Sequence, residues 1–79
     1  MNKKVYNAVK SGKSDNNISF NDFRNLIVDL GFKLDRQKGS HIIYVNKNIN
    51  EIMNIQPKGN KAKEYQVRDL RNIIFEYNL

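Results

Sequence analysis

The sequence lacks cysteine and tryptophan and has a single proline and a single histidine among its 79 residues. Without cysteine there are no disulfides, no thiolate zinc sites and no thiol redox chemistry. One histidine also leaves no cluster of ligands with the spacing of a metal site. A domain this short buries only about 60% of its unfolded surface, which leaves little room for a cofactor beside the core. We therefore expect neither a metal nor a small-molecule cofactor.

Long apolar runs are missing as well. No run of consecutive apolar residues exceeds four, whereas a membrane-spanning helix needs about 20. The first residues, Met-Asn-Lys-Lys followed by a polar mixture, do not form the apolar segment of a signal peptide. We expect one small cytoplasmic domain that does not associate with membranes.

Positive charge is what the chain has in excess. Fourteen Lys and Arg against eight Asp and Glu give a net charge of +6. The excess is +4 in residues 1–13 and +5 in 33–63, while 14–32 and 64–79 carry −2 and −1. Concentrated positive charge suits a polyanion-binding face, because each neutralised phosphate releases counterions. A solvated surface that keeps a small domain in solution needs the same composition, so both interpretations stay open.

Two stretches have the apolar spacing of a helix. In each, apolar side chains recur at steps of 3, 3, 1 and 3, which places them on one helical face. The first helix is predicted to begin after Ser19, a good N-cap, and to end at Gly31, which permits a left-handed stop. The second is predicted from about Tyr65 to Tyr77. Each helix needs a surface against which to bury its apolar face.

Between these helices the apolar period changes to two, which predicts strands. The first strand begins at Phe32, the second is His41–Val45, and the third is Ile49–Gln56, ended by Pro57 because proline cannot donate a ladder hydrogen bond. Residues 37–40 read as a tight turn. The predicted fold is therefore α+β, in the order α-β-β-β-α, with a three-stranded antiparallel sheet and both main helices on one face.

A short additional helix precedes this unit. Val5, Tyr6 and Val9 recur at three-to-four spacing, and residues 11–17 are rich in turn formers. We expect residues 1–17 to form an N-terminal extension with a helix and a linker, and residues 18–79 to form the main domain.

His41 is the one side chain with an unperturbed pKa, about 6.5, that lets it take and give a proton near neutrality. It follows a turn in which Gly39 gives a ligand room to approach the backbone and the Ser40 hydroxyl can donate to a phosphate, with Arg36 and Lys38 just before. An RNA 2′-hydroxyl that attacks its own phosphodiester needs a general base and positive charge around the phosphorane, and it needs no metal. A histidine among cations meets that demand; a structural or surface histidine is the competing interpretation.

A second basic segment leads into the last helix. Lys58, Lys61 and Lys63 surround Gly59, and positive charge near a helix N-terminus favours a bound anion. The spacing is not that of a P-loop. Phosphate binding and a plain basic surface loop explain this segment equally well.

Four further residues near these segments each have two interpretations. Asp35 and Glu51 either orient the imidazole of His41 or are solvated charges. Tyr44 and Tyr65 either stack on RNA bases or belong to the core and its rim.

Several stretches of the sequence together carry a family resemblance: Gly31-Phe32, Arg36-Gln37-Lys38-Gly39-Ser40-His41, Ile43-Tyr44, Asn54-Ile55-Gln56-Pro57, Tyr65-Gln66-Val67 and Tyr77-Asn78-Leu79. With the lysine-rich loop, they resemble the HicA toxins, the small ribonucleases of bacterial HicAB toxin–antitoxin systems. The resemblance covers roughly residues 18–79, and its most specific element is Gly-Ser-His at this distance after Gly-Phe.

The resemblance implies a double-stranded-RNA-binding-domain-like fold, mRNA cleavage with His41 as the catalytic residue, and a HicB-type antitoxin that covers the active face. We therefore expect a type II toxin that is a metal-independent endoribonuclease and inhibits translation. His41 would be the general base, and Arg36, Lys38 and Ser40 would hold the phosphate. The alternative is a non-catalytic RNA-binding module that acts by occupancy, and a third class is an interaction protein whose basic face meets an acidic partner.

The sequence departs from its relatives at two places. Many relatives begin near the helix that follows Ser19, so residues 1–17 are an addition. Many also carry a second histidine in a Pro-x-His element after the third strand, where this sequence reads Gln56-Pro57-Lys58. The proton for the leaving 5′-oxygen would then come from Lys58, Lys61 or water.

Overall fold

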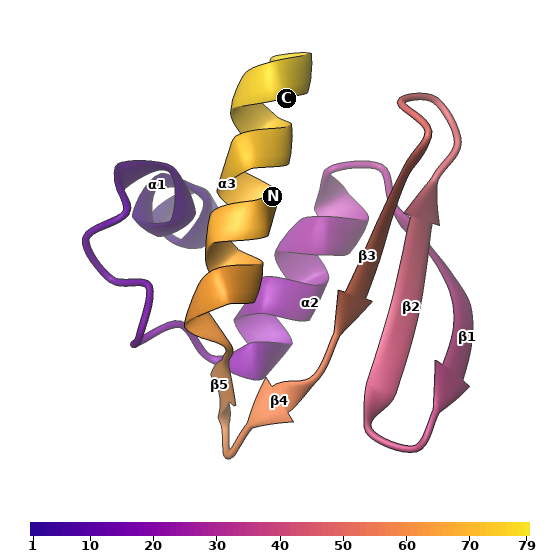
Figure 1. Cartoon of the computed structure of the whole chain (residues 1–79). Coiled ribbons are helices and arrows are strands. Elements are labelled where there is room, and N and C mark those ends of the chain that lie inside the picture. The colour runs from indigo at the N-terminus through magenta and orange to yellow at the C-terminus, as the bar shows by residue number, and fades with distance from the viewer.

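The chain forms two helices, then two small sheets, and then a third helix (Figure 1). The computed structural model describes all residues, 1–79. The helices are α1 (Lys3–Ser11), α2 (Phe20–Asp29) and α3 (Glu64–Tyr77). Strands β1 (Lys33–Lys38), β2 (His41–Asn46) and β3 (Glu51–Ile55) form an antiparallel sheet in that order, and β4 (Pro57–Lys58) pairs with β5 (Lys61–Ala62). The predicted α+β fold, α-β-β-β-α after a short extra helix, is confirmed.

The ends of α2 lie where the sequence places them. The Ser19 hydroxyl accepts a hydrogen bond from the backbone N–H of Asp22 at 3.1 Å, which satisfies one of the free donors of the first turn. Gly31 has a φ of 100°, a conformation that costs a glycine little. Phe32 then turns back into the core and is 1% exposed. The chain therefore leaves the helix and enters the sheet within a few residues.

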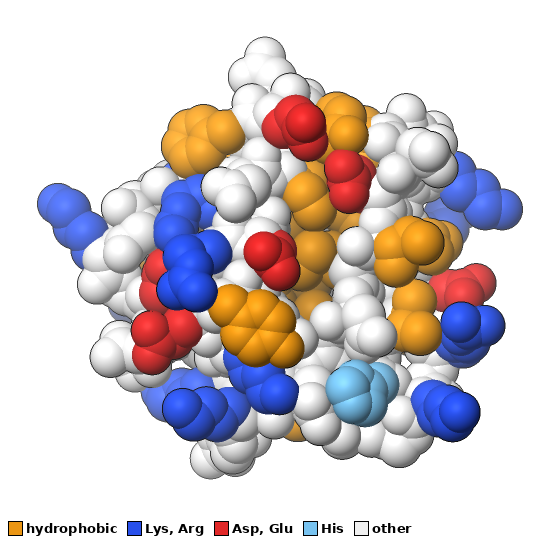
Figure 2. Space-filling model, in the orientation of Figure 1, with side chains coloured by type: hydrophobic (Ala, Val, Ile, Leu, Met, Phe, Trp, Pro, Cys, Tyr) orange, Lys and Arg blue, Asp and Glu red, His pale blue; other side chains and the backbone are white.

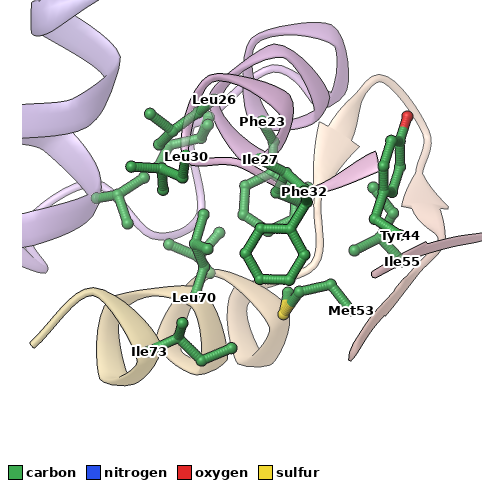
Figure 3. Packing of buried hydrophobic residues seen from close by; sticks show 14 of the residues in the cluster. Phe23, Leu26, Ile27, Leu30, Phe32, Tyr44, Met53, Ile55, Leu70 and Ile73 are labelled. Atoms are coloured by element: carbon green, nitrogen blue, oxygen red, sulfur yellow. The ribbon is translucent and has the colours of Figure 1, made fainter. Parts of the chain in front are cut away.

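The core lies between the sheet and the helices α2 and α3, which cover the same face (Figures 1 and 3). Ile42 and Tyr44 of β2 and Met53 and Ile55 of β3 are buried, so alternate residues of these strands face the helices. The other side of the sheet is not covered by any element (Figure 1). The fold therefore leaves one face of the sheet available for a site.

Two hairpins end on the same side of the molecule (Figure 1). The turn between β1 and β2 has Gly39 as its first central residue, and the turn between β4 and β5 has Gly59; both have a φ of 60°. A positive φ at the first central residue alone is the pattern of a type II′ turn, whose twist suits a hairpin. No heavy atom lies within 4 Å of a Cβ built on either glycine. The turn conformation, rather than crowding, accounts for glycine here.

Two details of the predicted strands are wrong. The segment 58–63 is a short hairpin rather than a loop, because Pro57 pairs with Ala62 and Lys58 with Lys61. The third strand begins at Glu51 and not at Ile49. Asn50 takes a left-handed φ of 56°, which extends the preceding turn.

The helix α1 packs on the side of α3 that lies away from the sheet (Figure 1). Val5 and Val9 belong to the same hydrophobic core as α2 and α3. Arg71 of α3 donates hydrogen bonds to the carbonyl oxygen of Val9 at 3.1 Å and to both carboxylate oxygens of Asp15 at 2.9 and 3.0 Å. The hydrogen bonds to the Asp15 carboxylate raise the pKa of Arg71 above its ordinary value. The division into residues 1–17 and 18–79 stays a prediction.

None of the three helices is both long enough and apolar enough to cross a membrane.

Candidate active site

His41 lies on the uncovered face of the sheet, at the first position of β2 (Figure 2). Because Ile42 is buried against the helices, the period of two directs the imidazole to the other side. Lys38 pairs with His41 in the register of β1 and β2, and Arg36 pairs with Ile43. Directly paired residues have side chains on one face. The two predicted cations and the histidine therefore share the exposed face.

Asn54 of β3 orients the imidazole. Its Oδ1 lies 3.3 Å from His41 Nδ1. An amide oxygen only accepts, so in this contact Nδ1 carries a proton, and in the neutral imidazole the lone pair then lies on Nε2. Asn54 pairs with Ile43 in the sheet, two residues along β2 from the histidine, so Asn54 and His41 are diagonal neighbours on the same face. The sheet register thus orients the imidazole through Nδ1 and leaves Nε2 without a protein partner.

A chain of hydrogen bonds links the glycine turn to the start of α3. Gln56 Nε2 donates to the Ser40 hydroxyl at 2.9 Å, and Lys63 Nζ donates to Gln56 Oε1 at 2.8 Å. Lys63 is the N-cap residue of α3, and its ammonium lies 6.0 Å from the ring centre of Tyr65. The amide of Gln56 therefore holds a lysine near the turn that precedes His41.

Gln66 braces the same end of β3. Its side chain is 4% exposed; its Nε2 donates to the carbonyl oxygen of Asn54 at 3.1 Å, and its Oε1 accepts from the N–H of Gln56 at 3.2 Å. One side-chain amide thus satisfies a backbone acceptor and a backbone donor as a neighbouring strand would. This fixes the backbone of the two residues that contact His41 and Ser40.

The predicted phosphate-binding residues divide into two groups. Arg36, Lys38, Gly39 and Ser40 surround His41 on β1 and the turn, and Lys63 joins them through Gln56. Lys61 Nζ instead donates to Asn17 Oδ1 at 2.8 Å, which directs it toward the linker. Lys58 is exposed on β4 and lines a shallow hollow with Lys63 and Arg68, so Lys63 borders both groups.

None of the four residues with two interpretations forms a hydrogen bond with the imidazole, which contacts Asn54. Glu51 accepts a hydrogen bond from the Tyr77 hydroxyl at 2.8 Å, and Asp35 is the extra residue at a bulge between Leu34 and Arg36. Tyr44 is 3% exposed, and its hydroxyl accepts from Arg24. Tyr65 is 50% exposed. Only the last is accessible for stacking on a base.

The sequence alone did not single out Asn54, Gln56 or Gln66. One signal was present: in a strand of period two, Met53 and Ile55 face inward, so Asn54 and Gln56 face outward beside β2. A buried polar residue in the first turn of α3 needs a partner, and the end of β3 is the nearest source of free backbone groups. The register, which fixes both contacts, comes from the fold.

The fold and this site define a small basic α+β protein with a solvent-exposed histidine, oriented by an amide and flanked by cations (Figure 2). No three His, Asp or Glu side chains lie together in a group that could hold a metal ion. Such a site provides a proton acceptor and positive charge for a phosphate-containing ligand.

The chain belongs to the family described as HicA toxin of bacterial toxin-antitoxin, whose model matches residues 20–74. This range runs from the first residue of α2 into α3 and includes the whole site around His41. The family that the sequence resembles is therefore confirmed, and with it the class of protein, a toxin with an antitoxin as its partner. Comparison with curated proteins and with solved structures gave no match.

Proposed function

We propose that this toxin is a metal-independent endoribonuclease of a type II toxin–antitoxin system, which cleaves mRNA in the cytoplasm and so inhibits translation. The observation that carries the proposal is the contact between His41 Nδ1 and Asn54 Oδ1 on the uncovered sheet face. It leaves Nε2 free to accept a proton, with Lys38 as the cross-strand neighbour. The partner is a HicB-type antitoxin, which we propose covers this face.

In the proposed reaction, His41 Nε2 takes the proton from an RNA 2′-hydroxyl. The 2′-oxygen then forms a bond to the adjacent phosphorus, and the bond from phosphorus to the 5′-oxygen breaks. The products are a 2′,3′-cyclic phosphate and a free 5′-hydroxyl. Arg36, Lys38 and Ser40 hold the phosphate and stabilise the charge of the phosphorane, and the open Gly39 turn admits the RNA backbone.

The leaving 5′-oxygen needs a proton. Of the three lysines in the segment 58–63, Lys63 is the one that hydrogen bonds connect to Ser40, whereas Lys61 is bound to Asn17. We assign proton donation to Lys63, with Lys58 and Lys61 as more distant contacts for the RNA strand. The basic hairpin thus extends the phosphate-binding surface beyond the cleaved bond.

His41→Ala tests the proposal. We expect RNA cleavage in the presence of EDTA to fall by about 10²–10⁴-fold, the share that a general base supplies, while circular dichroism and thermal unfolding stay as in the wild type. Asn48→Ala, which alters an exposed turn residue at the other end of β2, should cleave normally. Cleavage that survives His41→Ala would contradict the proposal, and growth arrest without cleavage in both proteins would favour action by occupancy.

The role of Lys63 has its own test. Lys63→Met should slow cleavage of normal RNA and leave unchanged the cleavage of an RNA with a 5′-bridging sulfur, because a thiolate leaves without a proton. Lys61→Met, which removes the same charge from the same hairpin, should slow both substrates equally through weaker binding. A Lys63→Met variant that is slow on both RNAs would show that Lys63 only binds.

A further inference from the structure

A groove with a volume of about 450 Å³ runs between α3 and β3 (Figure 2). Met53 and Ile73 form its apolar floor, and Ile52 at its rim is 65% exposed. Asn54, which contacts His41, lines the same groove. Nothing in the chain covers this groove.

The rim of the groove is acidic, although the protein carries a net charge of +6. Glu51, Asp69 and Glu76 line it, and no basic side chain does. The one ion pair of the molecule, Arg71 with Asp15, lies elsewhere, so none of the three carboxylates is neutralised by a salt bridge. Red side chains therefore gather over the hollow between α3 and β3 in Figure 2, apart from the cations around the histidine.

One wall of the groove is the open edge of the sheet. β3 pairs with β2 on one side and with no strand on the other. Asn54 directs its carbonyl oxygen to the open side, where Gln66 donates to it. The backbone N–H and C=O groups of every second residue of a strand face the same side, so those of Ile52 also face the open edge. The amide of Gln66 occupies one end of this edge as a peptide group would. The N–H and C=O of Ile52 are left for another partner.

We propose that this groove binds an extended segment of a partner protein, with alternating apolar and basic residues, as an added strand beside β3. The backbone of the segment pairs with Ile52, its apolar side chains lie on Met53 and Ile73, and its Lys or Arg side chains meet the acidic rim. RNA is excluded because the rim repels phosphate. A second copy of this chain is disfavoured because two β3 edges would bring two sets of carboxylates together.

Occupation of the groove is coupled to the site through Asn54, which belongs to both. A strand that pairs with β3 therefore constrains the residue that orients His41. Only this coupling rests on the proposed ribonuclease function; the binding itself does not, and it is measured without RNA.

The probe is the peptide acetyl-Lys-Ile-Arg-Val-Lys-Ile-Arg-amide, titrated into the full chain and followed by heteronuclear amide NMR. We expect saturable shifts of the amides of Ile52, Asn54 and Ile73. A peptide with glutamate in place of every Lys and Arg, and one with N-methyl groups on alternate amides that removes the hydrogen-bonding edge, should produce none.

Charge-matched variants sharpen the test. Asp69→Asn with Glu76→Gln should weaken binding of the basic peptide about fivefold, as two rim charges in water would. Asp22→Asn with Asp29→Asn removes the same charge from α2, outside the groove, and should leave the Kd unchanged. Both double variants keep His41, so RNA cleavage by each reports separately on the site.

Four results would overturn the proposal. The first is the absence of shifts at millimolar peptide. The second is a set of shifts confined to Lys38, His41 and their neighbours. The third is equal weakening by the two double variants. The fourth is dimerisation of the free chain, seen by sedimentation and abolished by Ile52→Lys, which would assign the groove to a second copy.

Discussion

The two faces of the sheet β1-β2-β3 carry alternate residues of the same strands, yet different forces hold their side chains. On the inner face, Ile42 and Tyr44 pack among the apolar residues of α2 and α3. On the outer face, His41 has no covering layer and is positioned by a hydrogen bond that its Nδ1 donates to Asn54, an exposed neighbour on β3. The inner face therefore supplies stability and the outer face carries the proposed active site, and substitutions should separate the two.

The largest expected effect is on the inner face. Phe23 of α2 has no exposed surface and lies in the core (Figure 3). Phe23→Ala should lower the free energy of unfolding by about 3–5 kcal/mol, because it removes buried area and leaves a cavity. Urea unfolding measures this loss. Phe75→Ala on α3, where the ring is 61% exposed, should cost less than about 1 kcal/mol; equal costs would contradict the one-sided core.

The attachment of α1 comes next in size. Arg71→Met removes the bonds to Val9 and Asp15 and should cost about 1.5–3 kcal/mol, the range for hydrogen bonds to charged groups. Hydrogen exchange should become faster in residues 5–17 and stay unchanged at β2 and β3. Arg68→Met, at an exposed position of the same helix, is the control. Unchanged protection of α1 would show that apolar packing alone holds it.

On the outer face, Asn54→Ala should slow RNA cleavage by up to about tenfold, which corresponds to the loss of one hydrogen bond. Asn54→Asp places a carboxylate beside His41 Nδ1 and so stabilises the imidazolium. The pKa of the base then rises, and the rise of rate with pH moves to higher pH, since the base works only when deprotonated. A pH–rate profile that does not move in Asn54→Asp would rule out orientation through this contact.

The smallest effect concerns the hydrogen bond between Tyr77 of α3 and Glu51 of β3. The hydrogen bond to Glu51 raises the pKa of Tyr77 to about 12 from its ordinary value of 10.0. The neutral phenol is the form favoured by folding, so this contribution to stability is complete below pH 10 and is lost as the pH rises through 12. Glu51→Gln should return the pKa toward 10, measured by NMR of the tyrosine ring carbons. Exposed Tyr65 is the internal control.

Local patterns in the sequence account for most of the secondary structure. The apolar spacing of α2, its Ser19 cap and the Gly31 stop concern residues within one or two turns of each other, and all three were predictable. The β1–β2 turn was predictable for the same reason, because its conformation depends on Gly39. The start of β3 was not, since Ile49 is a good strand former that a left-handed Asn50 separates from the ladder.

The partners within the site were less accessible to prediction. His41 stood out by its chemistry, and Arg36 and Lys38 by their proximity in sequence. The orienting role considered for Glu51 belongs to Asn54 instead, and Lys63 rather than Lys61 is connected to Ser40. These contacts join residues from different elements, and sequence spacing does not reveal which side chain reaches which.

The sequence by itself determined the basic charge, the helix faces, the glycine turns and the one residue able to act as a base near neutrality. The tertiary structure decided that Asn54 faces His41, that Gln66 replaces a strand at the edge of β3, and that three carboxylates gather around one groove on a basic protein. The physical reason is the strand register. A slip of one residue would turn every side chain of β3 to the opposite face, and the packing of Met53 and Ile55 against the helices, together with the hydrogen bonds with Gln66, fixes the register.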